Sequence, residues 1–303
     1  MSASLRIGVL MGGTSAERDV SLKTGAAVLA ALRRKGYDAV AIDVDATVPE
    51  RLARERVQLA FIALHGRLGE DGAIQGLLEV LGIPYTGSGV LASALGMDKV
   101  VSRRLFEAER LPVPRYVLVT RTASIPPLPF PFPVVVKPNG EGSSVGVSIV
   151  SQAAGLPAAL AQAFEYDRRV LIEAYIAGKE IQVGILGERA LGAIEIRLKT
   201  TFYDYVAKYT PGMSEHIFPA PLPPDVTRRT LDVALAAFRV LGCEGYGRVD
   251  FLVDEAGTPY VLEVNTLPGL TETSLLPDIA RGVGVGFDDL VEAIVTAALE
   301  RGT

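Results

Sequence analysis

Two carboxylates and one amide are spaced to meet near the C-terminal end of the sequence. The stretch 246–274, YGRVDFLVDEAGTPYVLEVNTLPGLTETS, predicts strands at 247–253 and 259–265, joined by the turn DEAGTP. Strand side chains alternate between faces, so Arg248 and Asp250 share one face. If the hairpin closes symmetrically about residues 256 and 257, Asp250 lies opposite Glu263 and Arg248 lies opposite Asn265.

Directly opposed carboxylates destabilise a sheet, and a hard dication removes that repulsion. Mg²⁺ takes oxygen ligands and usually keeps phosphate and water oxygens in its shell. Asp250, Glu263 and Asn265 therefore predict a site for one or two Mg²⁺ ions that carry a nucleotide's phosphates. The alternative is an exposed strand face with solvated acids. The TLPGL turn after Asn265 presents backbone N–H groups beside the same acids, which favours the ion site.

A glycine–serine loop near the middle of the chain predicts a phosphate flap. The segment 131–150, PFPVVVKPNGEGSSVGVSIV, reads as a strand, a loop and a second strand, with Lys137 at the end of the first. Backbone N–H groups and hydroxyls in EGSSVG are suited to closing over phosphates, although the GxxxxGK[ST] loop is absent. The alternative is an ordinary hairpin turn.

The N-terminal segment predicts a doubly wound α/β domain. RIGVLM (6–11) is a short buried strand, followed by the turn GGTSAE and a helix. Glu17 is a carboxylate at the mouth of that turn, and His65 lies in HGRLGEDG, at the sheet edge where such folds bind ligands. Plain turn chemistry and a structural histidine are the alternatives. His216 has no comparable setting and is assigned to the surface or a loop.

Composition excludes several classes of protein. The 303 residues are 49% hydrophobic and 21% charged, with a net charge of −5 and scattered basic residues, so neither a nucleic-acid nor a membrane partner is expected. Cys243 is the single cysteine, which fits a reducing, cytoplasmic compartment and predicts a buried structural thiol. No apolar run reaches the ~18 residues of a membrane span.

A long connection follows the segment FYDYVAKY (202–209). TPGMSEHIFPAPLPP (210–224) is expected to be a lid or binding loop, because loops of this length in compact domains usually have such a role. An amphipathic helix is predicted at 287–300, with its apolar face inward.

These motifs together resemble the D-alanine–D-alanine ligases of the ATP-grasp superfamily. GRVDFLVD…YVLEVNTLPGLTETS resembles their metal-binding end and FYDYxAKY their loop, and six motifs occur in the family order over nearly the whole chain. Val206 departs from the pattern, since many relatives carry glutamate there. The resemblance implies a mixed α/β ATP-grasp fold: an N-terminal doubly wound domain at 1–95, a central subdomain with the flap at 96–178, and a C-terminal subdomain at 179–303.

The resemblance also implies roles for particular residues. Catalysis is assigned to Glu17, Ser143, Tyr209, Arg248, Gly269 and Ser274. Substrate binding is assigned to Glu17, His65, Arg248, Gly269, Ser274 and Leu275. ATP binding is assigned to Lys99, Lys137, Glu141, Gly142, Ser143, Ser144, Val145, Glu173, Ala174, Ile176, Glu180, Phe202, Lys208 and Leu262, and metal binding to Asp250, Glu263 and Asn265.

The implied reaction joins two D-alanines at the expense of ATP, through D-alanyl phosphate, as a step of peptidoglycan precursor synthesis. ATP and two Mg²⁺ ions, with Mn²⁺ as a substitute, are the implied cofactors, and a homodimer is the implied assembly. The alternatives are a D-alanine–D-lactate ligase, another ATP-grasp amino-acid ligase, and a non-catalytic nucleotide-binding regulator. The complete metal triad with Arg248 argues against the regulator.

Overall fold

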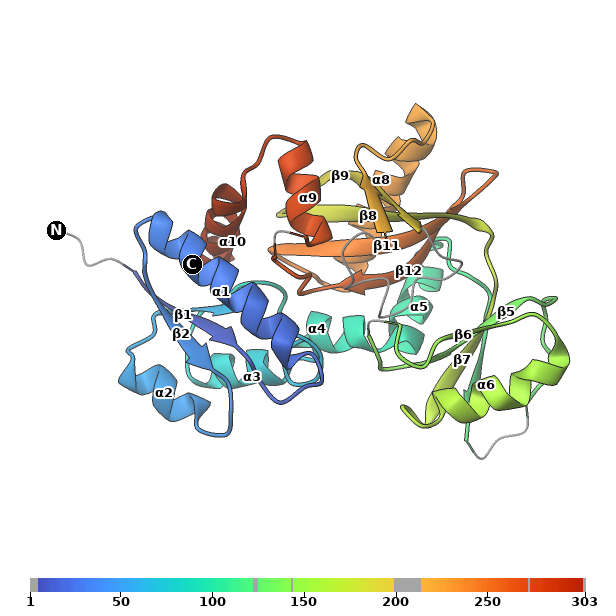
Figure 1. Cartoon of the computed structure of the whole chain (residues 1–303), viewed down its shortest axis with the longest axis horizontal. Coiled ribbons are helices and arrows are strands. Elements are labelled where there is room, and N and C mark those ends of the chain that lie inside the picture. Colours follow the sequence, from blue (N-terminus) through green and yellow to red (C-terminus); the bar gives the residue numbers. More distant parts are fainter. Residues whose placement is uncertain (1–4, 122–124, 143, 199–213, 272, 302–303) are drawn as a thin grey trace.

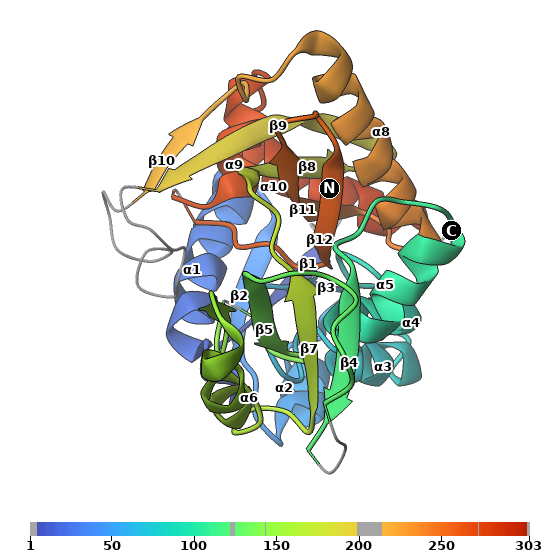
Figure 2. The same ribbon diagram turned by 90° about the vertical axis from the view of Figure 1, so that its right-hand side faces the viewer.

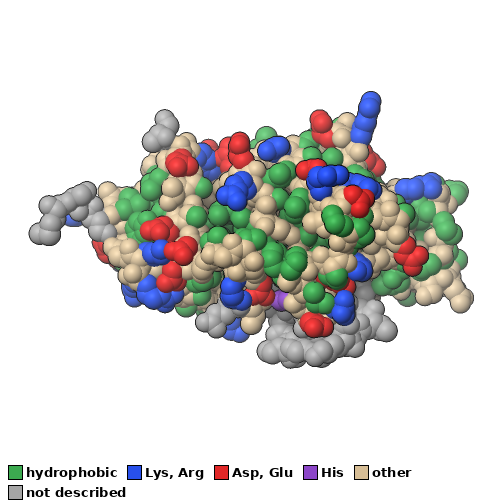
Figure 3. Space-filling view, turned by 90° about the horizontal axis from the view of Figure 1, so that it is seen from above, with side chains coloured by type: hydrophobic (Ala, Val, Ile, Leu, Met, Phe, Trp, Pro, Cys, Tyr) green, Lys and Arg blue, Asp and Glu red, His purple; other side chains and the backbone are tan. Residues whose placement is uncertain are grey.

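The computed structural model describes residues 5–121, 125–142, 144–198, 214–271 and 273–301. Its elements form three layers of sheet and helix along one axis (Figure 1). Over these ranges, none of the helices combines the length and the apolar character that crossing a bilayer requires. Arginine, lysine and acidic side chains are interspersed over the face seen in Figure 3.

The N-terminal layer is a three-stranded parallel sheet of order β2-β1-β3. Its elements are β1 (Arg6–Met11), α1 (Arg18–Arg34), β2 (Asp38–Asp43), α2 (Val48–Arg54), β3 (Leu59–Ile62), α3 (Ala73–Val80) and α4 (Val90–Met97). Consecutive residues of β1 and β3 are buried, which is typical of a parallel strand covered on both faces. Figure 1 shows α1 on one side of this sheet and α2 and α3 on the other.

The second layer in chain order is a four-stranded antiparallel sheet of order β4-β7-β5-β6, which lies at the right-hand end in Figure 1 and nearest the viewer in Figure 2. Its elements are α5 (Lys99–Ala108), β4 (Tyr116–Thr120), β5 (Val134–Pro138), β6 (Ser148–Val150), a 3-10 turn (Ala153–Gly155), α6 (Leu156–Ala163) and β7 (Arg169–Ala174). β5 and β6 form the predicted strands on either side of the glycine–serine loop. Helix α6 packs its apolar face on this sheet.

The third layer is a five-stranded antiparallel sheet of order β10-β9-β8-β11-β12. Its elements are β8 (Gly178–Leu186), β9 (Arg189–Leu198), β10 (Ser214–Ile217), α8 (Pro224–Val240), β11 (Tyr246–Asp254), β12 (Pro259–Asn265), α9 (Leu275–Gly282) and α10 (Phe287–Arg301). Helix α8 covers one face through Ala234 and Phe238, and α9 covers part of the other through Ile279.

The last helix packs on the first layer rather than on the sheet that precedes it in sequence. Leu290, Val291 and Ile294 of α10 share a core with β1 and β3. Arg34 of α1 binds Asp288 at 2.6 Å, and Lys35, which follows α1, binds Glu292 at 3.0 Å. The apolar face predicted for 287–300 is therefore confirmed, and it is directed towards α1 (Figure 1).

The loop prediction is wrong for the part of the connection at 210–224 that includes His216, while the role of this connection as a lid or binding segment stays a prediction. Ser214–Ile217 is not loop but an edge strand, β10, paired antiparallel with β9. His216 lies on it, and its Nδ1 is 2.8 Å from Oδ2 of Asp278 on α9. The pattern SEHI is too short for its alternation to be distinguished from loop. Cys243 is buried as predicted, and burial raises the pKa of its thiol to about 12.

Candidate active site

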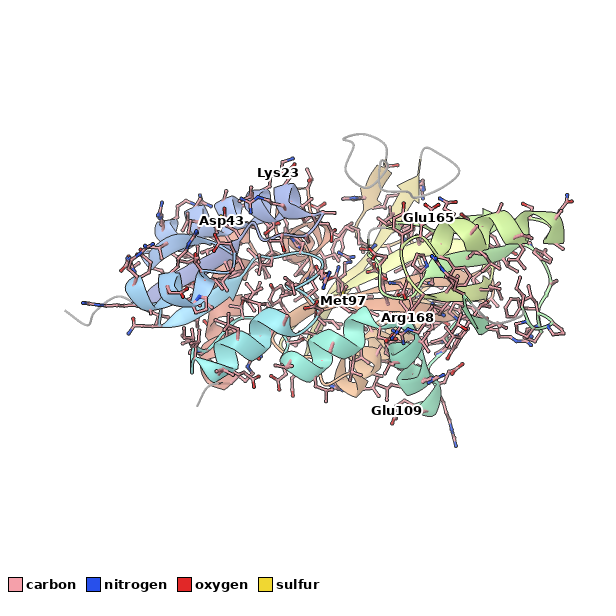
Figure 4. The ribbon with its side chains drawn as sticks, turned by 90° about the horizontal axis from the view of Figure 1, so that it is seen from below. Lys23, Asp43, Met97, Glu109, Glu165 and Arg168 are labelled. Carbon is pink, nitrogen blue, oxygen red and sulfur yellow. The ribbon has the colours of Figure 1, made fainter. Side chains whose placement is uncertain are left out.

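The start of α5 fixes the position of Lys99. Asp98 caps the helix by accepting a hydrogen bond from the Val101 N–H at 3.0 Å, and Oδ1 of Asn139 accepts from the Val100 N–H at 2.8 Å. Met97, just before this cap, lies where the first layer meets the rest of the molecule (Figure 4). Lys99 is 8% exposed and is directed away from solvent.

The Lys99 ammonium group connects the flap to the metal-type carboxylates. Its Nζ donates to the Glu141 carbonyl at 2.6 Å and lies 3.4 Å from Oε2 of Glu263. Glu141 begins the predicted phosphate flap, and Glu263 lies on β12. One cation therefore contacts both segments that the sequence assigns to phosphate and metal.

The predicted register of the β11–β12 hairpin is confirmed at the end that carries the acids. Asp250 pairs with Glu263, and Arg248 pairs with Asn265. The register shifts by one residue between Asp250 and Phe251, so the turn-side pairs differ from a symmetric closure. Leu262 is the extra residue of this β-bulge. The bulge turns two consecutive residues, Leu262 and Glu263, towards the same cavity, which strict alternation forbids.

The residues present fit a magnesium site. Asp250 and Glu263 offer carboxylate oxygens from adjacent strands, and Asn265 offers an amide oxygen whose Oδ1 accepts from the Leu267 N–H at 3.2 Å. Hard oxygen donors of this kind are those that Mg²⁺ prefers. Over the described ranges, no three His, Cys, Asp or Glu side chains group as a metal site. The donor set is thus two carboxylates and an amide, which leaves coordination positions for phosphate and water oxygens.

Arg248 is held against one of these carboxylates. Its Nε donates to Oδ1 of Asp250 at 2.7 Å, and its Nη2 donates to Oδ2 at 2.9 Å. Both residues are largely buried on one strand, two positions apart. A two-point contact of this geometry fixes the guanidinium plane, so the remaining N–H groups have a defined direction.

A cavity of about 440 Å³ opens between the four-stranded and five-stranded sheets. Every described residue that the sequence assigns to ATP lines it. These are Lys99, Lys137, Glu141, Gly142, Ser144, Val145, Glu173, Ala174, Ile176, Glu180 and Leu262, and Asp250 and Glu263 line it as well. The assigned residues come from both sheets and from α5, so the fold gathers segments that are distant in sequence around one space.

Two buried charges, Lys137 and Glu173, line the floor of this cavity, and a third, Arg103, lies beneath it. Glu173 lies between two cations, with Oε2 3.0 Å from Nζ of Lys137 and Oε1 2.9 Å from Nη2 of Arg103. Burial lowers the pKa of Lys137 to about 8. The charges of Arg103 and Lys99 act in the same direction, and Glu173 opposes them. Lys137 therefore loses its proton far more readily than an exposed lysine.

Glu17 and His65, which the sequence assigns to substrate, lie close together in the N-terminal layer. His65 is 7% exposed, with Nε2 3.0 Å from Oγ1 of Thr24 and Nδ1 3.2 Å from Oε1 of Glu70. Ser15 donates to the His65 carbonyl at 2.7 Å, which joins the GGTSAE turn to the HGRLGEDG loop. A Cβ atom at Gly66 would lie 2.8 Å from Oε2 of Glu17. Glu17 thus lies against this loop in the space that glycine leaves.

The segment after β12 packs against the N-terminal layer. Leu267 and Leu270 share the core of β1 and β3, so the turn that contains Gly269 is anchored on the first layer. A Cβ atom at Gly269 would lie 2.9 Å from Oγ of Ser274, and this hydroxyl accepts from the Thr271 N–H at 3.0 Å. Leu275 follows as the first residue of α9.

The structure does not bring all the assigned residues into one space. The residues that line the cavity do not include Glu17, His65, Arg248, Asn265, Gly269, Ser274 or Leu275, which lie on the N-terminal side or on adjoining strand and loop positions. Ser143, Phe202, Lys208 and Tyr209 lie outside the described residues. Their roles stay predictions.

Sequence reasoning missed Arg103 and Glu70. Glu70 belongs to the GEDG segment, and its hydrogen-bond contact with His65 follows from that motif's compactness. Arg103 follows Lys99 by four residues on α5, so both project from one face of the helix. That spacing was the available signal. It could not indicate a role for Arg103 until its partner on β7 was known.

Comparison with known proteins agrees with the geometry. Residues 46–88 match the family model described as "D-ala D-ala ligase N-terminus", and residues 105–296 match "D-ala D-ala ligase C-terminus". The D-alanine–D-alanine ligase of Geotalea uraniireducens is 62% identical over 97% of this chain and 95% of its own length. The D-alanine–D-alanine ligase of Geobacter sulfurreducens is 58% identical over 97% of this chain and 94% of its own length.

Solved structures give the same relationship. A D-alanine–D-alanine ligase from Bacillus anthracis complexed with ATP superposes with a TM-score of 0.88 at 36% identity, over 99% of both chains. A second structure of the ligase from that organism gives 0.89 at 39% identity, again over 99% of both chains. With the ATP-grasp fold, the cavity between its sheets and both family segments in place, the chain belongs to the D-alanine–D-alanine ligase family.

Proposed function

We propose that the chain uses ATP to join two D-alanine molecules into D-alanyl-D-alanine, with release of ADP and phosphate, for peptidoglycan precursor synthesis. The observation that carries the proposal is full-length identity of 54–62% to proteins named D-alanine–D-alanine ligase. The cavity lined by the residues assigned to nucleotide supports it. ATP as the nucleotide is supported by the ATP complex of the Bacillus anthracis enzyme.

A carboxylate is a poor acyl donor, so the reaction proceeds through D-alanyl phosphate. The second D-alanine's amine attacks this intermediate, and the tetrahedral adduct expels phosphate. Phosphoryl transfer depends mainly on positioning and charge stabilisation. Asp250, Glu263 and Asn265 would hold two Mg²⁺ ions, or Mn²⁺ as a substitute, and such ions neutralise charge on the transferred phosphoryl group.

The chain's own residues would divide the work between the two sides of the site. Lys99, Lys137 and Lys208 hold phosphates with the Ser143–Ser144 loop, while Glu173, Ala174, Ile176, Glu180, Phe202 and Leu262 form the nucleoside pocket. Arg248 and the Gly269 N–H stabilise charge on the reacting carboxyl group.

The N-terminal side and the start of α9 would hold the two amino acids. Glu17 takes the ammonium group of the first D-alanine, and His65 faces it. Ser274 and the Leu275 N–H take the carboxylate of the second. Ser143 or Tyr209 relays a proton from the attacking amine.

The assembly proposed is a cytoplasmic homodimer formed through an apolar face of α3 and α4. Val80 is 86% exposed, Leu81 40% and Leu91 71%, and these residues define the α3/α4 face. Exposed apolar side chains on two helices that contact each other support an interaction surface there.

Phosphate release in the presence of different acceptors tests the function. The protein, ATP and Mg²⁺ are incubated with D-alanine, L-alanine, other D-amino acids or D-lactate. Release that depends on D-alanine is expected. No phosphate release with nucleotide still bound contradicts a ligase and fits the non-catalytic regulator. Release that needs no amino acid is ATP hydrolysis, and it contradicts both a ligase and that regulator.

Equal concentrations of D-alanine and D-lactate at neutral pH then separate the two ligase types. The AKY segment at 207–209, which resembles the dipeptide-forming enzymes, supports D-alanyl-D-alanine as the main product. A product that is mainly D-alanyl-D-lactate overturns this choice.

A further inference from the structure

Arg103 is the largest side chain that is completely buried in the described chain, with 0% exposure. A guanidinium group stays charged at any physiological pH, and burying a charge is costly unless it is paired. Its partners therefore show what the residue does. Arg103 itself does not line the cavity, although the residues that it touches do.

The Arg103 guanidinium joins the two walls of the cavity. Its Nη2 lies 2.9 Å from Oε1 of Glu173 on β7 and donates to the Leu262 carbonyl of β12 at 3.4 Å. Its Nη1 donates to the Pro114 carbonyl at 3.3 Å, and the group lies 5.7 Å from the centre of the Tyr116 ring. Glu173 and Leu262 belong to different sheets, so one side chain sets the spacing of both.

The charges beneath the cavity do not cancel. Arg103 and Lys137 carry one positive charge each when protonated, and Glu173 between them carries one negative charge. Since Glu173 forms ion pairs with both Arg103 and Lys137, its negative charge does not compensate Lys137 alone. Of the two cations only Lys137 faces the cavity, so the excess positive charge is presented there. The lowered pKa of Lys137 agrees with an ammonium group that lacks full compensation.

We propose that Arg103 is a positioning residue for the nucleotide: it neutralises Glu173 and holds the Leu262 carbonyl, so that the charge of Lys137 stays available to a polyphosphate. The identity of the ligand as ATP rests on the proposed function, but the charge argument needs only a nucleoside polyphosphate. Without Arg103, Lys137 becomes the sole counter-ion of Glu173, and an incoming phosphate must compete with that carboxylate.

A double-mutant cycle in the full chain tests the proposal. The dissociation constant of ADP, with Mg²⁺ present, is measured by calorimetry for the wild type, Arg103→Met, Glu173→Gln and the double variant. Arg103→Met is expected to raise the dissociation constant of ADP by about tenfold, which is within the range of coupling between contacting residues. The double variant is expected to bind ADP more tightly than Arg103→Met, because it no longer contains the unpaired carboxylate.

Arg104→Met is the matched control, since Arg104 is the next residue on α5 and is exposed. Its ADP affinity should equal that of the wild type. Arg103→Lys retains the charge and should recover part of the affinity, and a thermal melt of each variant establishes that it is folded. Arg103→Met should change the affinity for adenosine less than the affinity for ADP, because adenosine lacks phosphates.

Unchanged ADP affinity in folded Arg103→Met, or a double variant no tighter than Arg103→Met, overturns the proposal. The latter result means that Arg103 acts only through packing. Failure of the wild type to ligate D-alanine contradicts the proposed function instead, and it leaves the ADP cycle interpretable.

Discussion

Nζ of Lys99 lies 3.4 Å from Oε2 of Glu263, so a lysine at the start of α5 neutralises a carboxylate on β12. The two are assigned to different partners, the lysine to phosphate and the carboxylate to metal. A Mg²⁺–nucleotide complex brings both partners at once. Lys99 can then exchange the Glu263 carboxylate for a phosphate, and Glu263 can exchange the Lys99 ammonium group for Mg²⁺. The Lys99–Glu263 ion pair thus holds both charges at the cavity, where each group can turn to its assigned partner.

Replacing Glu263 with Gln should abolish ligation and leave the fold intact. The substitution preserves shape but removes one of the two carboxylate charges assigned to Mg²⁺, and it also frees Lys99 from its partner. Turnover is measured over a Mg²⁺ titration. Glu255→Gln, in the exposed turn of the same hairpin, is the control and should behave as the wild type. Normal turnover of Glu263→Gln at ordinary Mg²⁺ concentrations would show that the metal assignment is wrong.

ADP affinity should decline above about pH 8. The pKa of Lys137 is lowered to about 8 from 10.5, so above that pH the free protein has lost the proton that a bound phosphate favours. Affinity should fall only about twofold between pH 7 and 8 and then weaken by up to about tenfold per pH unit, as expected when binding requires uptake of one proton. Calorimetry from pH 7 to 9.5 measures this. Lys137→Met should bind more weakly with a flat profile, and an equally steep decline in that variant refutes the assignment.

Gly66→Ala should raise the KM for D-alanine by about tenfold or more, since small misplacements of substrate-binding groups have large effects. The backbone φ at Gly66 is +68°, and the added methyl group would lie 2.8 Å from Oε2 of Glu17. Gly242→Ala is the matched control, because its φ is +70° and no atom lies within 4 Å of the added Cβ. Both variants should lose about 1–2 kcal/mol of stability. An unchanged KM in Gly66→Ala contradicts the placement of Glu17 at the ammonium group.

Charges placed on the α3/α4 face should give a monomer. Val80→Glu with Leu91→Glu puts two carboxylates on side chains that are 86% and 71% exposed, and an interface there cannot pair them. Sedimentation velocity measures the mass in solution. Val283→Glu, at an exposed apolar residue after α9, is the control and should remain dimeric. If the wild-type protein is monomeric at all concentrations, the proposed dimer is wrong.

The sequence predicted the hairpin site well because its information is local. Turn chemistry and alternation place Asp250 opposite Glu263, as the structure confirms, but the bulge at Leu262 depends on how β12 fits its neighbours and has no compositional signal. Arg103 was missed for the opposite reason. Its partner Glu173 is distant in sequence. The buried ion pair between them can be recognised only when the positions of α5 and β7 in the fold are known.

The pairing of α10 with α1 has a consequence for how the chain is made. The core of the first sheet is completed by Leu290, Val291 and Ile294, which a ribosome adds long after β1, β2 and β3 have emerged. During that interval the N-terminal strands and helices have an uncovered apolar surface, so they cannot reach their final stability as an isolated folding unit. Synthesis of the last helix is then the event that closes the first layer, and nascent chains that stop before Phe287 should be preferred clients of chaperones and proteases.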